Sequence, residues 1–133
     1  MAPRACVLRT SWVVGAHGSN FLKTMLRLAG EKTELRVVAD QIGVPTSTQL
    51  LTHVTHRVLQ QMAGADMSDP RWGIYHLAPK GETSWHTYAQ HIIEGARQRG
   101  APLKLDTASH FVLCFIKALF SPLNLSHLLA CFL

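Results

Sequence analysis

A chain of 133 residues, 47% of them hydrophobic, is long enough for one domain with its own core and too apolar to be disordered. Its net charge of +5 at pH 7 comes from basic residues scattered singly along the chain, which argues against a nucleic-acid partner. Three cysteines without metal-ligand spacing argue against a disulfide framework or a zinc site and favour a reducing, cytoplasmic location.

The first predicted element is a strand that ends near Trp12, where a β-rich run starting at residue 6 is closed by Gly15. Over residues 20–31 the apolar side chains recur at helical spacing, which predicts an amphipathic helix. Ser19 or Asn20 is the expected N-cap, because a short polar side chain can accept from the free backbone N–H groups of the first turn.

The most informative segment of the chain, residues 35–46, follows this helix. Residues 35–38 are apolar enough for a short buried strand, and Asp40 and Gln41 come where that strand would leave a sheet. Thr46 then begins a Thr-x-x-Gln capping box, which predicts a helix over residues 47–63. A strand, a polar turn and a capped helix in this order are typical of the ligand-binding edge of an α/β protein.

A third strand and helix complete the pattern. Residues 72–77 form the expected strand, and Ser84 caps a helix that Gly100 ends. Strand and helix thus alternate three times, which predicts an α/β fold with a partial, Rossmann-like parallel sheet and alternating helices.

The candidate binding site follows from that topology. Strands of a parallel sheet point the same way, so segments 11–20, 40–46 and 77–82 would lie along one edge. A tryptophan at a strand end can offer a flat apolar face to a sugar or a base, and amides can satisfy hydroxyl groups. The alternative is a tryptophan buried in the core beside polar residues that make Asx turns. The residues that a ligand would meet are Ser11, Trp12, Asn20, Asp40 and Gln41.

Four blocks of sequence carry a family resemblance: Arg9-Thr-Ser-Trp-Val-Val-Gly15, Gly18-Ser-Asn-Phe21, Arg36-Val-Val-Ala-Asp-Gln-Ile-Gly-Val-Pro-Thr46, and Gly73-Ile-Tyr-His-Leu-Ala78 with Gly81 and Ser84-Trp85. Over about residues 3–105 they resemble the carboxy-terminal, substrate-binding part of the dTDP-4-dehydrorhamnose reductases, which are extended short-chain dehydrogenase/reductases. The resemblance implies an oxidoreductase of dTDP-L-rhamnose biosynthesis that uses NADPH to reduce the 4-keto group of a dTDP-linked deoxysugar.

The resemblance also implies roles for individual residues. Ser11 and Trp12 would lie against the deoxysugar, Asn20 would approach the nucleotide-sugar, and Gln41 would help to close the pocket. Val14 departs from the tyrosine that is usual in the family. The full set of expected substrate-binding residues is Ser11, Trp12, Asn20, Asp40, Gln41 and Thr46.

The chain does not contain the family's chemical machinery. No G-x-x-G-x-x-G loop follows a strand, so the backbone that would hold the phosphates of NADPH is absent. Tyr75 and Tyr88 have Pro79 and Ile92 four residues on, so no Tyr-x-x-x-Lys pair supplies a proton donor. We therefore expect no catalytic residue in this chain, and a missing amino-terminal cofactor half as its partner. The alternative is a non-catalytic nucleotide-sugar-binding or regulatory module.

The histidines give weak evidence for a metal. His53 and His56 are three apart on a predicted helix and could share a face, but no third ligand has a predicted place beside them. We expect solvated helix positions and no metal site. The resemblance implies magnesium at a subunit contact in some family members, with ligands that have no match in this sequence.

The resemblance stops near residue 105, which divides the chain into a substrate-binding part, 1–105, and a divergent apolar tail, 106–133. One interpretation of the tail is a membrane anchor, although Lys117 and several polar residues interrupt it. The other is an aberrant end that replaced the native terminus, which we favour because the composition changes where the resemblance stops. A tail of that origin would pack poorly on the domain.

Overall fold

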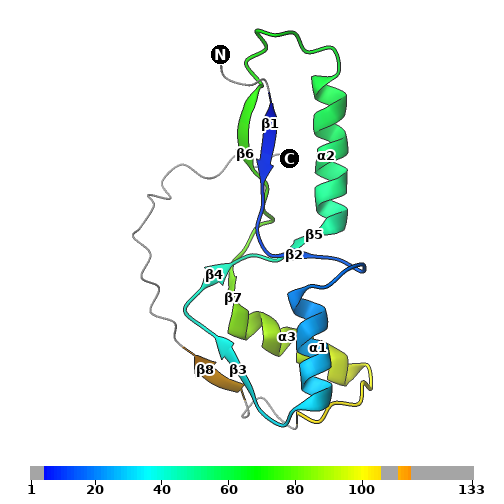
Figure 1. Cartoon of the computed structure of the whole chain (residues 1–133), viewed down its shortest axis with the longest axis vertical. Coiled ribbons are helices and arrows are strands. Elements are labelled where there is room, and N and C mark those ends of the chain that lie inside the picture. Colours follow the sequence, from blue (N-terminus) through cyan, green and yellow to red (C-terminus); the bar gives the residue numbers. More distant parts are fainter. Residues whose placement is uncertain (1–4, 106–110, 115–133) are drawn as a thin grey trace.

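A computed structural model describes residues 5–105 and 111–114 of the chain (Figure 1). The molecule is elongated, with one helix beside a pair of strands at one end, two crossed helices with a second pair at the other, and short strands between them (Figure 1). In chain order the elements are β1 (Cys6–Arg9), β2 (Val13–Val14), α1 (Phe21–Glu31), β3 (Leu35–Val38), β4 (Ile42–Gly43), β5 (Thr46–Ser47), α2 (Thr48–Met62), β6 (Gly73–His76), β7 (Thr83–Ser84), α3 (Trp85–Gln98) and β8 (Phe111–Cys114).

The three principal strands run in parallel pairs, which confirms the α/β class, but they do not share one sheet. β1 pairs with β6, with Cys6 opposite Gly73, and β3 pairs with β8, with Leu35 opposite Phe111. The prediction of a single three-stranded sheet was therefore wrong. The strands are separated because β3 packs through the buried side chains of Leu35 and Val37 into a core with α1 and α3, away from β1 and β6.

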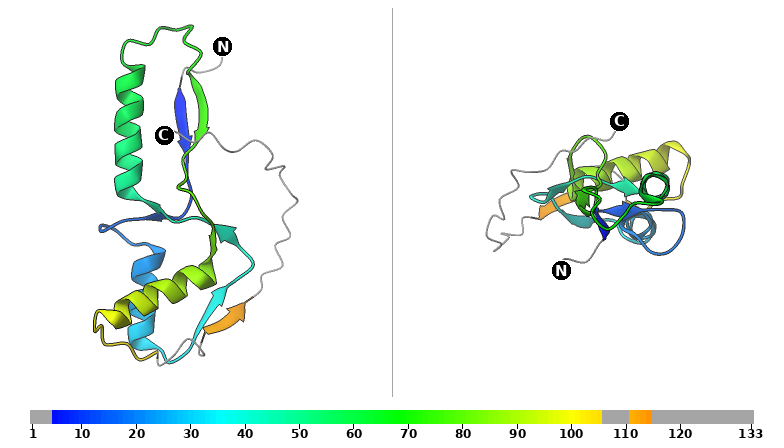
Figure 2. Two further views of the ribbon diagram at one scale, coloured as in Figure 1. Left: turned by 180° about the vertical axis from the view of Figure 1, so that it is seen from behind. Right: turned by 90° about the horizontal axis from the view of Figure 1, so that it is seen from above.

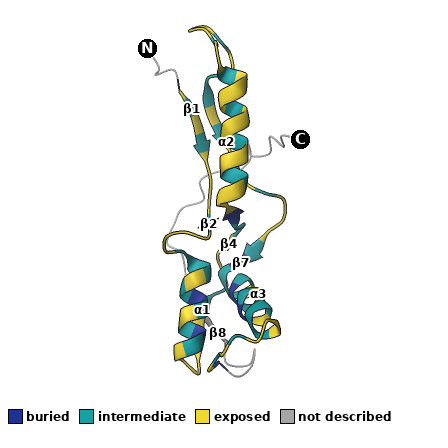
Figure 3. Ribbon diagram, turned by 90° about the vertical axis from the view of Figure 1, so that its right-hand side faces the viewer, coloured by how far each residue is buried: buried dark blue, intermediate teal, exposed yellow. Residues whose placement is uncertain are grey.

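That core holds most of the buried apolar side chains of the described residues (Figure 3). The segment after α3 is fastened to it: the backbone N–H groups of Lys104 and Leu105 donate to the Ala29 carbonyl, and Arg97 donates to the Leu105 carbonyl over 2.6 Å. Leu105, 1% exposed, thus closes the core at the point where the sequence resemblance ends. The core residues are Met25, Ala29, Leu35, Val37, Ala89, Ile93 and Leu105.

β8 brings four residues beyond the predicted boundary at 105 into the fold, as the second strand beside β3. Residues 106–110 and 115–133 lie outside the described part of the chain, so the boundary, the anchor and the aberrant end stay predictions. Within the described residues, no helix combines the length and apolar content that crossing a membrane requires.

The helix starts test the capping predictions. Asn20 caps α1 by accepting from the Lys23 N–H, and Ser84 caps α3 by accepting from the Thr87 N–H, as expected. The prediction that Thr46 caps the second helix was wrong, because Ser47 accepts from the Leu50 N–H instead. Thr46 lies in β5 instead, where its backbone N–H donates to the Trp12 carbonyl and its side chain is buried.

The end of the molecule formed by β1, β6 and α2 is packed more loosely. α2 runs alongside the β1–β6 pair (Figures 1 and 2), yet none of its residues is fully buried. The apolar stripe of α2 is only partly buried; its residues are Leu50, Leu51, Val54, Val58 and Met62.

Candidate nucleotide-sugar site

The segments that follow the three principal strands meet in the middle of the molecule. Two short pairings join them: β2 lies parallel to β5, with Val13 opposite Thr46, and β4 lies antiparallel to β7, with Gly43 opposite Thr83. The predicted segments 11–20 and 40–46 are thus brought together, and the third contact is made by β7, which begins at Thr83, directly after the predicted segment 77–82. These contacts arise from local pairings and not from the edge of one sheet.

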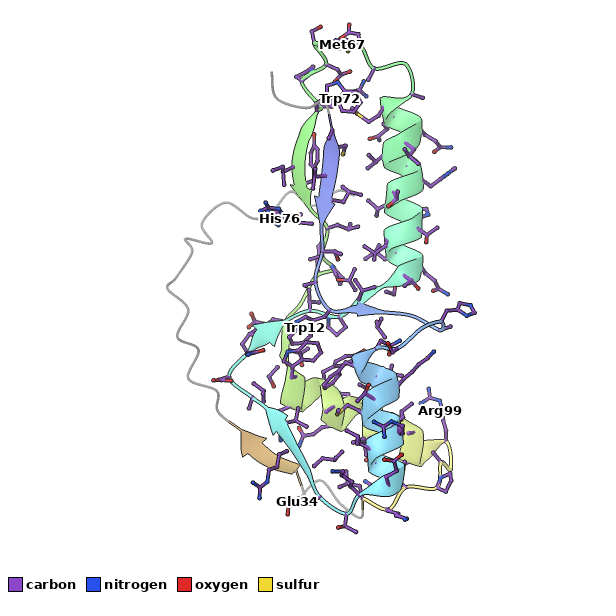
Figure 4. All side chains as sticks on the ribbon, viewed as in Figure 1. Trp12, Glu34, Met67, Trp72, His76 and Arg99 are labelled. Atoms are coloured by element: carbon purple, nitrogen blue, oxygen red, sulfur yellow. The ribbon has the colours of Figure 1, made fainter. Side chains whose placement is uncertain are left out.

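Trp12 lies at the centre of this junction (Figure 4). Its indole stacks on that of Trp85, with ring centroids 3.6 Å apart and planes inclined by 18°. Gly43 lies against the same indole, since a Cβ on Gly43 would come within 2.6 Å of the Trp12 ring. Trp12 has a φ of 45°, in the left-handed region that bulky residues rarely adopt. Its half-buried ring thus has one face covered by Trp85 and a backbone held in a strained conformation.

Two further aromatic rings extend the stack. Phe21, the first residue of α1, lies 4.4 Å from Trp85 and 5.7 Å from Tyr88 between ring centroids. Burial among these rings raises the pKa of the Tyr88 phenol. We call Trp12, Phe21, Trp85 and Tyr88 the aromatic cluster. Sequence reasoning placed only Trp12 at the site; the signal for Trp85 was its position directly after the helix cap Ser84.

Five of the six predicted site residues fall into two groups. Ser11 and Thr46 join Trp12: the Ser11 hydroxyl donates to the Val44 carbonyl over 3.4 Å, and Thr46 is buried with no hydrogen bond from its Oγ1 atom to any described residue. Asp40 and Gln41 are exposed, and their side chains form no hydrogen bond within the described part of the chain. Their polar groups are therefore open to solvent or a ligand.

Asn20 has a structural role in addition to any binding role. Its Oδ1 atom accepts from the Lys23 N–H over 3.1 Å, and its amide donates to the Gly15 carbonyl over 2.8 Å. One amide hydrogen and one lone pair remain for a ligand. Asn20 thus shapes the turn before α1, as the alternative interpretation of the polar residues predicted.

Comparison with known proteins decides the family. All residues from 1 to 133 match the model of the RmlD substrate binding domain. The chain belongs to this family. It is 45% identical to the dTDP-4-dehydrorhamnose reductase of Escherichia coli K12 over 101 residues, which are 75% of this chain and 32% of the relative. It is 40% identical to the spore coat polysaccharide biosynthesis protein SpsK of Bacillus subtilis over 104 residues, 78% of this chain and 34% of that protein.

Solved structures agree with this assignment. A dTDP-4-dehydrorhamnose reductase from Bacillus anthracis in complex with NADP superimposes with a TM-score of 0.65 and 31% identity, over 85% of this chain and 34% of that one. An orthologue from Clostridium acetobutylicum gives a TM-score of 0.63 and 33% identity, over 83% of this chain and 33% of that one. The chain thus spans about a third of the length of the relatives that it matches.

The residues of this chain do not themselves fit NADPH. The loop before α1 comes nearest to a phosphate-binding loop, with Gly15 and Gly18 three apart, but the third position is Phe21, whose ring is taken up by the aromatic cluster. The ammonium group of Lys23 closes the loop on itself by donating to the carbonyls of Ala16 and Gly18. We therefore derive no cofactor step from this chain.

The described residues of the RmlD substrate-binding domain contain no group of three or more His, Cys, Asp or Glu that could hold a metal ion. His53 and His56 line a shallow depression of about 460 Å³ on α2, beside Thr48, Gln49 and Thr52. Magnesium at a subunit contact stays a prediction from the family resemblance.

Proposed function

We propose that this chain is the nucleotide-sugar-binding part of an NADPH-dependent dTDP-4-dehydrorhamnose reductase, and that it binds a dTDP-linked deoxysugar beside Trp12. The observation that carries the proposal is the meeting of three loop segments at the aromatic cluster, in a chain of the RmlD substrate-binding domain family. Relatives named as reductases, one of them solved with NADP, support the reaction class.

The residues at the junction suit such a ligand. Trp12 is only partly buried although its indole stacks on Trp85, and the accessible part of the ring can pack against the apolar face of a deoxysugar. Asp40 and Gln41, both exposed and without a described partner, can accept from and donate to sugar hydroxyl groups. Ser11, Asn20 and Thr46 shape the junction through their backbone and side-chain hydrogen bonds.

Hydride transfer requires groups that this chain does not supply. Its sequence contains neither the glycine-rich loop nor the Tyr-x-x-x-Lys pair, so the proposal assigns both to a cofactor half on the remaining two thirds of a reductase. We expect the purified chain alone not to oxidise NADPH with dTDP-4-dehydrorhamnose. Turnover of about 1 per second or more, as is usual for enzymes, would contradict the assignment of the catalytic groups to the cofactor half.

Intrinsic fluorescence tests binding directly. Titration with dTDP-rhamnose should change the emission in a saturable way, and Trp12→Phe should remove that change. Trp72→Phe is the matched control, because Trp72 lies in the turn before β6, far from the junction, with its indole N–H donating to the Asp66 carbonyl (Figure 4). An unchanged titration in Trp12→Phe, or no saturable change in the parent chain, would contradict the proposed site.

The second candidate is a non-catalytic nucleotide-sugar-binding or regulatory module, which the absence of the Tyr-x-x-x-Lys pair favours. Both candidates predict sugar binding at Trp12 and a cytoplasmic location. They differ when the chain is combined with the cofactor half of a relative, since only a reductase part would restore NADPH oxidation. Sugar binding without restored oxidation would support the module.

A further inference from the structure

A groove between the crossed helices α1 and α3 has no role in the candidate site, which it touches only at Tyr88 (Figure 1). Its volume is about 690 Å³, and most of its walls are apolar side chains that are only partly buried, among them Leu22 and Leu26 of α1 and Ile92 of α3. Leu103, in the segment after α3, also lines it. We call this cavity the α1–α3 groove. Mostly apolar walls and a volume of roughly 300–1,000 Å³ are typical of a site for a small molecule.

Two side chains with nitrogen donors interrupt these apolar walls. His91 and Arg99 both line the groove and are exposed, and neither forms an ion pair with a described residue. No Asp or Glu of the described part of the chain lines the groove. A guanidinium is always charged in proteins, so the groove carries a positive charge that no described carboxylate neutralises. An anionic group is the complement of such a site.

Gly95 gives the guanidinium of Arg99 its place at the carboxyl end of α3 (Figure 4). His91, Gly95 and Arg99 are four residues apart, so they lie on one face of this helix. The Nη1 atom of Arg99 donates to the Gly95 carbonyl over 2.7 Å, and a Cβ on Gly95 would lie 3.1 Å from the same nitrogen. Glycine inside a helix is less favourable than alanine, but here it lets the guanidinium turn back along α3 towards His91. The other N–H groups of Arg99 donate to no described residue.

The walls of the groove distinguish between kinds of ligand. Both walls are helices, whose backbone groups are bonded within the helix, so they offer no row of donors and acceptors to an extended peptide. The groups that can bind an anion gather on one face of α3, and most of the remaining lining is apolar. We propose that the α1–α3 groove binds a straight-chain fatty acid. Its carboxylate accepts from Arg99 and His91 above Gly95, and its chain lies on the apolar side chains of α1 and α3.

Calorimetric titration of the full chain with decanoate tests this site. Binding should saturate at one equivalent, and Arg99→Gln should weaken it at least tenfold, because a neutral amide lacks the charge. Gly95→Leu should weaken it as much, since the leucine side chain would fill the place of the carboxylate while favouring the helix. Arg57→Gln is the matched control, because Arg57 is exposed on α2 and outside the groove; it should change the affinity less than twofold. Circular dichroism of each variant shows that it is folded.

Three results would overturn the proposal: no saturable binding of decanoate, equal affinities in all variants, or equal affinity for decyltrimethylammonium, which has the same chain and the opposite charge. Displacement of decanoate by dTDP-rhamnose would be a fourth, since it would place the chain in the aromatic cluster. Trp12→Phe should leave the decanoate affinity within twofold, and Arg99→Gln should leave the dTDP-rhamnose titration unchanged. Failure of the sugar site and failure of the fatty-acid site can therefore be told apart.

Discussion

The contact between Gly43 and Trp12 makes a sharp test of the candidate site. In Gly43→Ala, the new Cβ would lie 2.6 Å from Cε2, 2.7 Å from Cζ2 and 3.0 Å from Nε1 of the indole. Carbon atoms in favourable contact are about 3.5–4.0 Å apart, so the ring must move by about 1 Å. Trp85 covers one face of that ring, and β4 is held to β7, so neither side can yield freely.

We expect Gly43→Ala to lower the free energy of unfolding by about 1–3 kcal/mol, the usual cost of overpacking. In a domain of roughly 100 residues each 1 kcal/mol lowers the melting temperature by about 4–8 °C. The near-ultraviolet circular dichroism of the stacked Trp12–Trp85 pair should weaken, and the affinity for dTDP-rhamnose should fall about tenfold as the ring leaves its position.

Gly73→Ala is the control for backbone effects, because a Cβ at Gly73 would meet nothing within 4 Å. It should be neutral or stabilise the chain by up to about 1 kcal/mol, through a less flexible unfolded state. A Gly43→Ala variant that keeps the stability, the tryptophan dichroism and the sugar affinity of the control would show that Trp12 does not depend on the close approach of Gly43.

Three further predictions concern stability. Leu105→Ala should lower the free energy of unfolding in urea by about 2–5 kcal/mol because Leu105 is 1% exposed, whereas Leu59→Ala, at an exposed position, should change it by less than about 0.5 kcal/mol. Deletion of 106–133 should lower that free energy more than deletion of 115–133, since only the longer deletion removes β8 from its ladder with β3; equal losses would contradict a role for β8. Hydrogen bonds from Arg71 lower the pKa of Asp69 to about 2. The contribution of this ion pair to the free energy of unfolding is therefore complete above about pH 4 and is lost as the pH falls through about 2. An NMR titration of Asp69 with a midpoint near 4 would contradict this.

Local signals in the sequence predicted local structure well. The apolar spacing of α1 and the Ser84 cap of α3 depend on residues within a few positions of one another, and both were located correctly. The start of α2 was misplaced by one residue because Thr46, with Gln49 three residues on, satisfies the capping-box pattern, whereas the observed cap Ser47 has Leu50 in that place. What removes Thr46 from that role is a hydrogen bond to Trp12, far away in the sequence.

Long-range pairing was the part that periodicity could not predict. The same short apolar strand can pair with any other, and only burial in the α1–α3 core sets β3 beside β8. The Trp12–Trp85 stack likewise depends on two-residue pairings such as β4 with β7, which leave no pattern in composition. The candidate residues were thus found by their chemistry, and their neighbours were not.

The left-handed backbone of Trp12 has a consequence for the adaptability of this protein. A bulky residue with a φ of 45° costs about 1–3 kcal/mol relative to a relaxed conformation, and glycine is the residue that relieves this strain. The packing of its indole against Trp85 and Gly43 offsets that cost, because loss of a packed aromatic side chain costs about 3–5 kcal/mol. Replacement of Trp12 by glycine would therefore relax the backbone and still destabilise the junction, so that the ring serves the fold as well as the aromatic surface.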